Sequence, residues 1–397
     1  GANASGKSNF IHILEFIRDI EMHGLENAVS LQGGSEYLRN IKIGHNHNLS
    51  IEITLEVTGF GILPIDGAGY NLRIEAPEVM YKFALGFPNN KPGFEIIEEE
   101  LSGTINIIKV EDRKEEPLIS KFRIKSHKGK LETAFDTPKE LHKDKEKIEN
   151  TIFPFNEFFK HIPGKVSSMP ESVETSLLKF PMFLRIQFSE LGVYNFNPRL
   201  LRESMPISGK ADLEEDGSNL PIVLKNIIDN TEKKRKFLNL VSDVLPFVED
   251  LEVERLADRS MLLRLREAYS QKNFLPASCL SDGTLNLTAL IISLYFERKE
   301  PVIIEEPERN IHPHLISRTL QMMKEAAVEK QVIVTTHNPE LLKHADIEDL
   351  LFISRDRDGF SRIARPAHSR DIQTFIENEM SIDELYVQNL MEIPGGK

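Results

Sequence analysis

The sequence predicts an α/β fold with a phosphate-binding loop, to which an antiparallel β subdomain and a helical insertion are added. Three observations predict it. The segment Gly1–Ser8 matches the pattern GxxxxGKS at every fixed position. Residues 41–125 contain short runs in which apolar and polar side chains alternate, as in antiparallel strands with one buried face. Two apolar runs, 302–306 and 331–337, end in polar residues and flank a helical pattern, which indicates parallel strands joined by a crossover helix.

The glycine-rich segment is predicted to bind phosphate. Its glycines leave backbone N–H groups free to surround an anionic oxygen, and the helix that follows points its positive end at the same oxygen. In this motif the lysine, Lys7, reaches the β- and γ-phosphates, and the hydroxyl of Ser8 ligates Mg²⁺. A loop of this kind follows a buried strand, so we expect such a strand before Gly1. The residues assigned to nucleotide binding here are Asn3, Ser5, Gly6, Lys7, Ser8 and Asn9.

Composition limits the partners. The net charge of −13 argues against nonspecific binding of nucleic acid by the whole surface, so DNA or RNA contacts are expected only at the basic stretches Lys121–Lys130 and Lys233–Lys236. A solvated face explains these stretches more simply. The single cysteine, Cys279, rules out an internal disulfide, is expected to be buried, and fits a cytoplasmic location. No apolar run approaches the roughly 20 residues of a membrane span, so no membrane partner is expected.

A chain of 397 residues is longer than one simple core requires, so we expect several parts. Within the middle of the chain, Asp216–Leu220 is predicted to open a helix capped by Asp216 or Ser218. The expected parts are residues 1–130 with the phosphate-binding loop and the antiparallel sheet, 131–250 as a helical lobe with a strand near 182–189, 251–369 with the remaining motifs, and 370–397 as a tail.

A second phosphate-binding surface is predicted at Leu280–Thr284. Ser281 and Gly283 begin a predicted helix that runs to about residue 296, so a hydroxyl, a small residue and free N–H groups lie at a positive helix end. An ordinary helix cap explains the same residues equally well. Gln32, in the turn after the first helix, is a candidate to contact Mg²⁺ or its water, although a solvated turn residue is the simpler interpretation.

The carboxyl ends of the two apolar runs supply the catalytic candidates. Glu305 is expected to hold Mg²⁺ through water, and Glu306 to orient and deprotonate the attacking water as general base. His337 follows the next strand, where it could bond the γ-phosphate and sense its loss, or simply cap a helix. Residues 349–353 are predicted to add one more parallel strand.

The order of these motifs resembles that of the ABC-class ATPases, and their residues resemble the motifs of the OLD/SMC/RecF-like branch with its AAA_21-type members. The resemblance rests on Walker A at Gly1–Ser8, a signature at Leu280–Thr284, Walker B running into Glu305–Glu308, and His337. It also covers His312-Pro313 and the DGSNL segment at 216–220, whereas the helical insertion is unmatched. The fold that it implies is a P-loop NTPase with an ABC-type ATPase head.

The resemblance implies a mechanism and partners. In that family one ATP is held between the Walker A loop of one subunit and the signature of another, so two chains form a homodimer around two ATP molecules. ATP and Mg²⁺ are the implied cofactors. The implied function is Mg²⁺-dependent ATP hydrolysis in DNA maintenance or antiphage defence, with a separate effector protein as a further partner.

Three other functions stay open. A transporter's ATPase subunit fits the long insertions poorly. An ATP-gated nuclease of the OLD type would need a metal-binding domain after His337, where only Asp356, Asp358 and Asp371 are candidates and solvated turns are the simpler interpretation. A non-hydrolysing ATP sensor would use the nucleotide only to fix a protein interface.

Overall fold

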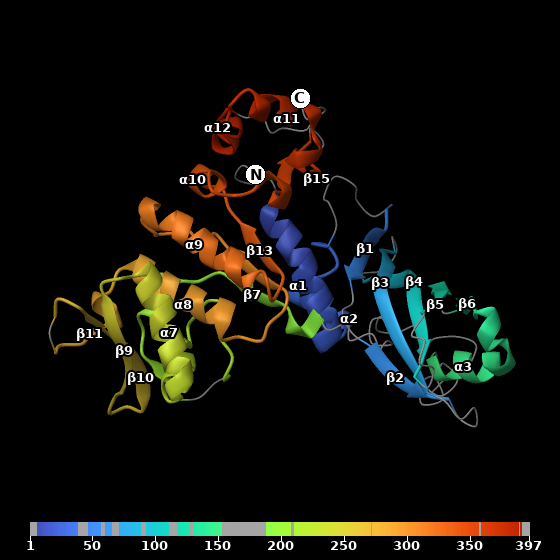
Figure 1. Cartoon of the computed structure of the whole chain (residues 1–397), viewed down its shortest axis with the longest axis horizontal. Helices are drawn as coiled ribbons and strands as arrows, with labels where there is room; N and C mark the ends of the chain where they lie inside the picture. Colours follow the sequence, from blue (N-terminus) through green and yellow to red (C-terminus); the bar gives the residue numbers. More distant parts are fainter. Residues whose placement is uncertain are drawn as a thin grey trace. The chain divides into compact units, whose positions relative to one another are not determined.

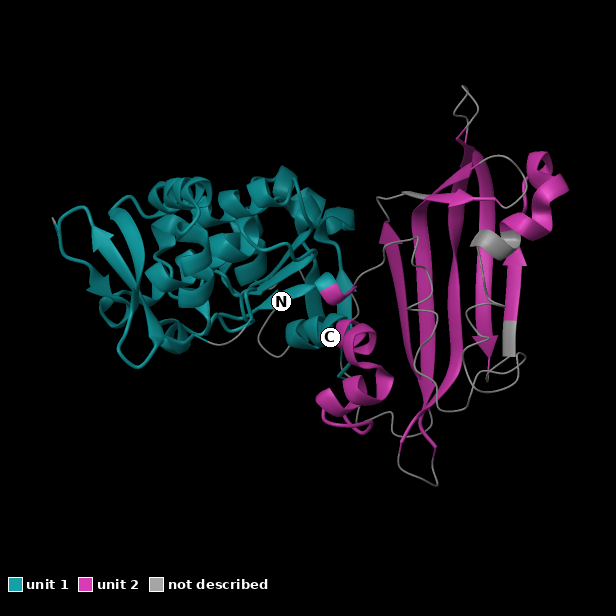
Figure 2. Ribbon diagram, turned by 90° about the horizontal axis from the view of Figure 1, so that it is seen from below, with its two compact units in different colours: residues 1–15, 190–397 teal, residues 16–189 magenta. Residues whose placement is uncertain are grey.

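The computed structural model divides the chain into two compact units, which we describe separately (Figure 2). Unit 1 contains residues 1–15 and 190–397, and unit 2 contains residues 16–189. The structure describes residues 6–38, 47–56, 60–65, 71–88, 93–110, 117–127, 130–152, 188–207, 210–270, 272–356, 359–388 and 390. Across these ranges no helix is both long and apolar enough to traverse a bilayer.

Unit 1 is built on a three-stranded parallel sheet with β12 in its centre, between the strands β7 and β13 that Figure 1 labels. The central strand is Val302–Glu305, and its neighbours are β7 (Gly192–Tyr194) and β13 (Val332–Thr335). The crossover helix α9 (Pro313–Ala326) joins β12 to β13, as the sequence predicts. Val302, Ile303 and Ile304 are buried, because both faces of the sheet are covered.

One helix covers the first face of this sheet. The start of α1 (Lys7–His23) places Ile11 against Val193 of β7 and Ile303 of β12. On the other face, α8 (Asp282–Tyr295) and α9 pack in a large apolar core that also contains Val302 and Ile304. The sheet therefore presents its carboxyl edge, where β7, β12 and β13 all end, as the place for a site.

Two helices in the range 131–250, which was expected to form a helical lobe, belong to this core. α6 (Leu220–Ile228) and α7 (Thr231–Val244) bury Leu224 and Phe237 in the same cluster as α8. The unit boundary thus lies at Glu190 and not near residue 250. The strand expected at 182–189 falls largely outside the described residues, and the strand of this region is β7. Besides α6 and α7, the α-helices and strands between β7 and α8 are α5 (Pro198–Leu201), β8 (Met205–Pro206), β9 (Val248–Arg255), β10 (Ser260–Glu267) and β11 (Leu275–Pro276).

The last strand pair differs from the prediction. β14 (Phe352–Arg355) pairs with antiparallel β15 (Ser361–Ala364) in a separate two-stranded sheet instead of extending the parallel sheet. Its apolar side is used elsewhere, because Phe352 packs in a small core with Ile372 and Leu385 of the C-terminal helices. Those helices are α11 (Arg370–Glu377) and α12 (Ile382–Val387), and the short helix α10 (Pro339–Leu342) follows β13.

Unit 2 confirms the antiparallel β subdomain. Five strands follow the order β1-β3-β4-β5-β6, and β2 pairs with β3. The long strand β3 alternates buried and exposed residues over much of its length, with Tyr81 and Phe83 in the interior, which is why this sheet has one apolar face. The elements of unit 2 after α1 are α2 (Leu25–Leu31), β1 (Leu49–Glu56), β2 (Phe60–Pro64), β3 (Asn71–Gly86), β4 (Glu95–Lys109), β5 (Leu118–His127), β6 (Lys130–Phe135) and α3 (Lys145–Ile152).

Neighbouring carboxylates form ion pairs with the two basic stretches. On β5, Arg123 pairs with Glu100 at 2.8 Å and Lys125 with Glu98 at 3.2 Å, both on β4. The Arg123 hydrogen bonds hold the pKa of the Glu100 carboxyl below its ordinary value. On α7, Lys234 pairs with Asp250 at 3.1 Å. These pairs reduce the positive charge that either stretch can offer to a nucleic acid.

The segment Asp216–Leu220 forms a tight turn that leads into α6. Asp216 accepts a hydrogen bond from the Ser218 N–H, Gly217 has a φ of 78°, and the N-cap of α6 is Asn219, so neither Asp216 nor Ser218 is the cap. Asn219 is only 1% exposed. Its amide donates to the carbonyls of Lys210 (3.3 Å) and Asp212 (2.8 Å) and accepts from the Glu214 N–H (2.8 Å), so one side chain organises the loop before the helix.

Replacing Asn219 by alanine should lower the free energy of unfolding by about 2 kcal/mol, because three part-buried backbone groups lose their hydrogen-bond partner. Urea unfolding of the purified chain measures this. Asn239→Ala, at an exposed position on α7, is the matched control and should change it by less than about 0.5 kcal/mol. Equal losses in the two variants would show that Asn219 does not organise the loop.

Candidate functional site

The candidate site lies at the carboxyl edge of the parallel sheet. Asn195 follows β7, Glu305 ends β12 with Glu306 directly after it, and His337 follows β13. Parallel strands end at the same edge, so the sequence order alone brings these polar residues together. The structure brings Glu306 and His337 into contact at this edge, and Glu305 lies at the adjacent end of β12.

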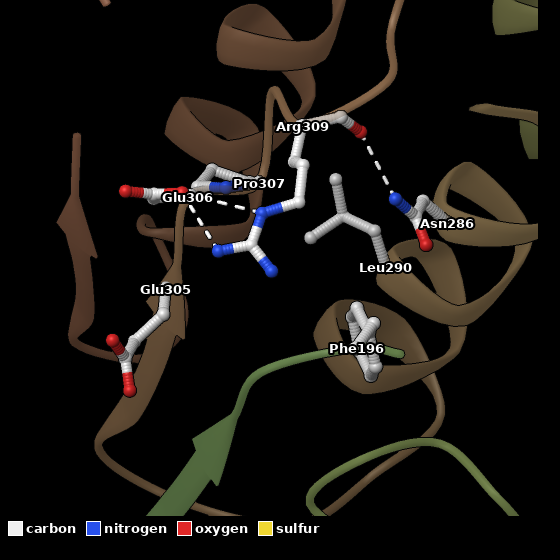
Figure 3. Close-up of a pocket in the computed structure, with 7 residues that line it drawn as sticks. All are labelled: Phe196, Asn286, Leu290, Glu305, Glu306, Pro307 and Arg309. Atoms are coloured by element: carbon white, nitrogen blue, oxygen red, sulfur yellow. Dashed lines mark hydrogen bonds and ion pairs between the residues drawn. The ribbon is translucent and has the colours of Figure 1, made fainter. Parts of the chain in front are cut away.

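Glu306 is held by partners on both carboxylate oxygens. His337 Nδ1 lies 2.6 Å from Oε1, and Arg309 donates to Oε2 from Nε (3.2 Å) and Nη2 (2.7 Å). Figure 3 shows the Arg309 guanidinium beneath this carboxylate. Desolvation raises the pKa of Glu306, but the hydrogen bonds and charges of Arg309 and His337 together outweigh it, so the pKa lies below the ordinary value of a glutamate.

The backbone at Glu306 is strained. Its φ is 46°, in the left-handed region that side chains other than glycine rarely adopt, and its N–H donates to the carbonyl of Thr335 at 2.8 Å. Such a conformation costs on the order of 1 kcal/mol or more and persists where the surroundings impose it, often at functional sites. The turn directs the Glu306 side chain toward β13 and the loop that carries His337.

The loops after β12 and β13 are joined by a second carboxylate. Glu308 is 6% exposed, and its Oε1 accepts a hydrogen bond from the hydroxyl of Thr336. That hydroxyl in turn accepts from the Asn338 N–H at 2.9 Å, at the N-cap of α10. Burial raises the pKa of the Glu308 carboxyl. Its Oε2 is buried with no hydrogen-bond partner among the described residues, as expected of a group that meets a ligand, an ion or a water.

The phosphate-binding loop reaches the same charges. Lys7 begins α1, and the negative charges of Glu306 and Glu308 act on its ammonium group, although desolvation outweighs them and lowers the pKa of Lys7. Gly6 is buried with a φ of 109°, and an added Cβ there would collide with the side chain of Ser361 on β15. The Phe10 N–H donates to the Gly6 carbonyl at 3.0 Å, which fixes this first turn. The cradle therefore requires glycine at position 6.

The remaining predicted residues of the loop differ in how far the structure describes them. Ser8 and Asn9 are exposed at the start of α1. Asn3 and Ser5 lie outside the described residues. Gln32 follows α2 in unit 2, so its role as a metal contact stays a prediction.

The donor atoms fit Mg²⁺. The Ser8 hydroxyl and the Glu305 carboxylate are oxygen ligands, which hard cations prefer, and Mg²⁺ in such sites keeps several waters and takes few protein ligands. Within the described ranges no group of three or more histidine, cysteine, aspartate or glutamate side chains could hold a metal ion.

The start of α8 is exposed and rigidly built. Ser281 is its N-cap, and the serine Oγ accepts from the Thr284 N–H at 3.1 Å. Arg202 holds this helix start on both sides of Ser281. Its Nη2 donates to the Leu280 carbonyl at 2.8 Å, and its Nη1 pairs with Asp282 at 2.5 Å. Ser281 thus acts as a helix cap and at the same time faces solvent, where a ligand can reach it. Cys279, expected to be buried, is also exposed at this end of α8.

Gly283 places this helix start against the turn after Glu306. A Cβ on Gly283 would lie 2.5 Å from the Asn310 carbonyl, so the two backbones touch. One turn further along α8, Asn286 donates to the Arg309 carbonyl at 2.9 Å. A small, shallow pocket lies here, shown in Figure 3 and lined by Phe196, Asn286, Leu290, Glu305, Glu306, Pro307 and Arg309.

The sequence alone did not identify five residues that shape this site, namely Asn195, Arg202, Glu308, Arg309 and Thr336. Glu308 is the last residue of the Glu305–Glu308 segment that carries the family resemblance, but the sequence assigned it no role. Asn195, Arg202 and Thr336 have no local signal, because their contacts join segments far apart in the chain. Arg309 contacts Glu306 only three residues earlier, but an arginine at that spacing is not a recognisable motif.

Comparisons with known proteins identify the family. The chain matches, over residues 1–343, the family model AAA_21, described as "AAA domain, putative AbiEii toxin, Type IV TA system". No curated protein matches the chain.

Solved structures similar to this chain include SMC heads. An SMC head bound to the C-terminal winged-helix domain of ScpA is 15% identical, with a TM-score of 0.41, over 92% of this chain and 88% of that one. An SMC head from Pyrococcus furiosus, bound to the C-terminal domain of ScpA, is 14% identical, with a TM-score of 0.36, over 96% and 91%. These likenesses are too distant to transfer any property.

The family match, in contrast, covers most of the chain, and its ATPases bind a nucleotide, typically with Mg²⁺. The chain belongs to the AAA_21 family of P-loop ATPases.

Proposed function

We propose that this chain hydrolyses ATP to ADP and phosphate, with Glu306 as the general base. The observation that carries the proposal is the arrangement of Glu306. It directly follows a buried parallel strand, shares a 2.6 Å contact with His337, and lies close enough to Lys7 for its charge to act on the lysine ammonium. A carboxylate with a lowered pKa is ionised at neutral pH, as a proton acceptor must be.

The reaction divides among the residues as follows. Lys7 and the backbone of the loop before α1 bind the β- and γ-phosphates. Glu306 takes a proton from the attacking water as the bond between the γ-phosphorus and the bridging oxygen breaks, and ADP leaves. His337 orients Glu306 and senses the γ-phosphate, while Ser8 and Glu305 would hold Mg²⁺, which neutralises phosphate charge when bound.

We propose that the site is completed by a second copy of the chain. Ser281 is exposed, and Asp282 and Gly283 are half-buried at a positive helix end, so the serine hydroxyl and the N–H groups of this first turn can bind the γ-phosphate of an ATP held on another copy. The family resemblance favours this arrangement. Two copies would then enclose two ATP molecules, and hydrolysis would release the copies from each other.

The biological setting follows from the family resemblance alone. We propose DNA maintenance or antiphage defence, in which the ATP-driven closure of two copies acts on a separate effector. A nuclease is less well supported, because Asp356 is engaged by Arg362 at 3.2 Å and by the Phe360 N–H at 2.9 Å, Asp358 is not described, and Asp371 lies in the first turn of α11.

Glu306→Gln should keep ATP binding and lower turnover by about 10²-fold or more, the effect of losing a general base. Phosphate release and binding of a fluorescent ATP analogue measure the two quantities. Glu329→Gln, exposed beyond the end of α9, is the control and should leave both unchanged. Turnover that survives in Glu306→Gln would remove this residue from the mechanism.

Ser281→Arg should abolish ATP-dependent dimerisation and leave nucleotide binding to the single chain intact, because the bulky cation blocks the helix start. Analytical ultracentrifugation with ATP, in the Glu306→Gln background, measures the dimer. The lost cap costs about 1 kcal/mol, so a melting curve should show a folded protein. Ser242→Arg, exposed on α7, should still dimerise. A dimer that persists in Ser281→Arg would refute the role given to this helix start.

A further inference from the structure

Arg309 connects three parts of the site. Its guanidinium donates to Glu306 Oε2 from Nε and Nη2, and its Nη1 lies 3.5 Å from Asn195 Oδ1, after β7. Its main-chain carbonyl accepts from Asn286 of α8. One residue therefore links the ends of two strands with the serine-bearing helix.

The guanidinium occupies the atom that a general base needs. A carboxylate oxygen takes a proton from water through a lone pair, and both donors of Arg309 point at Oε2 of Glu306. Oε1 already accepts from His337. With Arg309 in this position, three of the roughly four lone-pair sites of the ionised carboxylate are occupied, which restricts its capacity to receive a proton from water.

The start of α8 cannot shift independently of Arg309. Asn286 is 5% exposed, and its hydrogen bond to the Arg309 carbonyl is 2.9 Å long. Three residues earlier, Gly283 lies in backbone contact with Asn310, next to Arg309. Close-packed backbones transmit a displacement, because neither side can yield without losing its contacts.

The Arg309 side chain is able to move. It is 45% exposed, and beside it lies the shallow pocket lined in part by Phe196, Leu290 and Glu305 (Figure 3). The guanidinium can rotate away from Glu306 without displacing buried groups, and the charge of Glu305 offers an alternative partner.

We propose that Arg309 is a positioning residue that restrains Glu306 until the start of α8 engages the phosphate of an ATP bound to a second copy, and that this engagement withdraws the guanidinium. The inference rests on the proposed function, whose general base it regulates. It explains how a chain with Glu306 and His337 already in contact avoids wasteful hydrolysis when it is alone.

ATP turnover per chain, measured from dilute to concentrated protein, tests the proposal. The wild type should be slow when dilute and faster when concentrated. Arg309→Ala should raise the turnover of the dilute protein about tenfold, on the scale of one charge-assisted hydrogen bond, with KM unchanged. Arg309→Lys, which keeps the charge without the two-pronged contact, should fall between them. Arg318→Ala, which removes an arginine of α9 paired with Asp243, is the control and should follow the wild type.

The outcomes separate this inference from the proposed function. If the wild type has no ATPase activity, or Glu306→Gln keeps it, the proposed function fails and the inference with it. If Glu306→Gln is inactive but folded Arg309→Ala is no faster than the dilute wild type, only the inference fails. Should Arg309→Ala not fold, Asn195→Ala serves instead, because it removes the other partner of the same guanidinium. Turnover of the dilute Asn195→Ala protein must then rise, though by less than tenfold, and unchanged turnover overturns the inference.

Discussion

The contact of Glu306 with His337 across two parallel strand ends is the interaction on which the rest of the structure depends. It exists because β12 and β13 pair in register, with Glu305 opposite Thr335, so that the next residues of both strands meet at the same edge. Burial of Val302, Ile303 and Ile304 between α1 and the α8–α9 layer fixes the position of β12, and so the position of the strand end that carries Glu305 and Glu306. A strained backbone at Glu306 and the carboxylate of Glu308, which binds Thr336, then hold the two loops together.

The same edge explains why charge is concentrated there. Lys7, Glu306, Glu308 and Arg309 act on one another in a setting that is only partly open to water, so each charge is felt more strongly than on the surface. Glu308 is buried, and one of its oxygens has no hydrogen-bond partner in the described part of the chain, which costs stability and is tolerated where a ligand or water completes the bonding. The site is thus built at some expense to the fold.

Sequence patterns predicted the residues that local chemistry defines and missed those that tertiary contacts define. The strand ends at Glu305 and at 335–337 followed from apolar runs, because runs of that length in an α/β pattern are buried strands. Arg309 gave no signal, because an arginine three residues after a glutamate in a turn is an ordinary surface pattern, and its other contacts are with Asn195 and Asn286, which lie 114 and 23 positions earlier. The pairing of β14 with β15 was missed for a related reason, because an apolar run does not state which strand it will join or that Phe352 packs under the C-terminal helices. Cys279 was expected to be buried from its residue type alone and is exposed.

The central claim is that one active site is shared between two copies of the chain. Mixing two inactive variants tests it most directly. Lys7→Ala loses the phosphate-binding lysine, and Ser281→Arg blocks the helix start. In a mixed dimer one site carries both lesions and the other carries none. An equimolar mixture should recover turnover that neither variant has alone, on the order of a quarter of the wild-type value if the chains pair at random, because only a mixed dimer contains a complete site and it has one such site of two. A mixture that stays as inactive as its components would contradict the account.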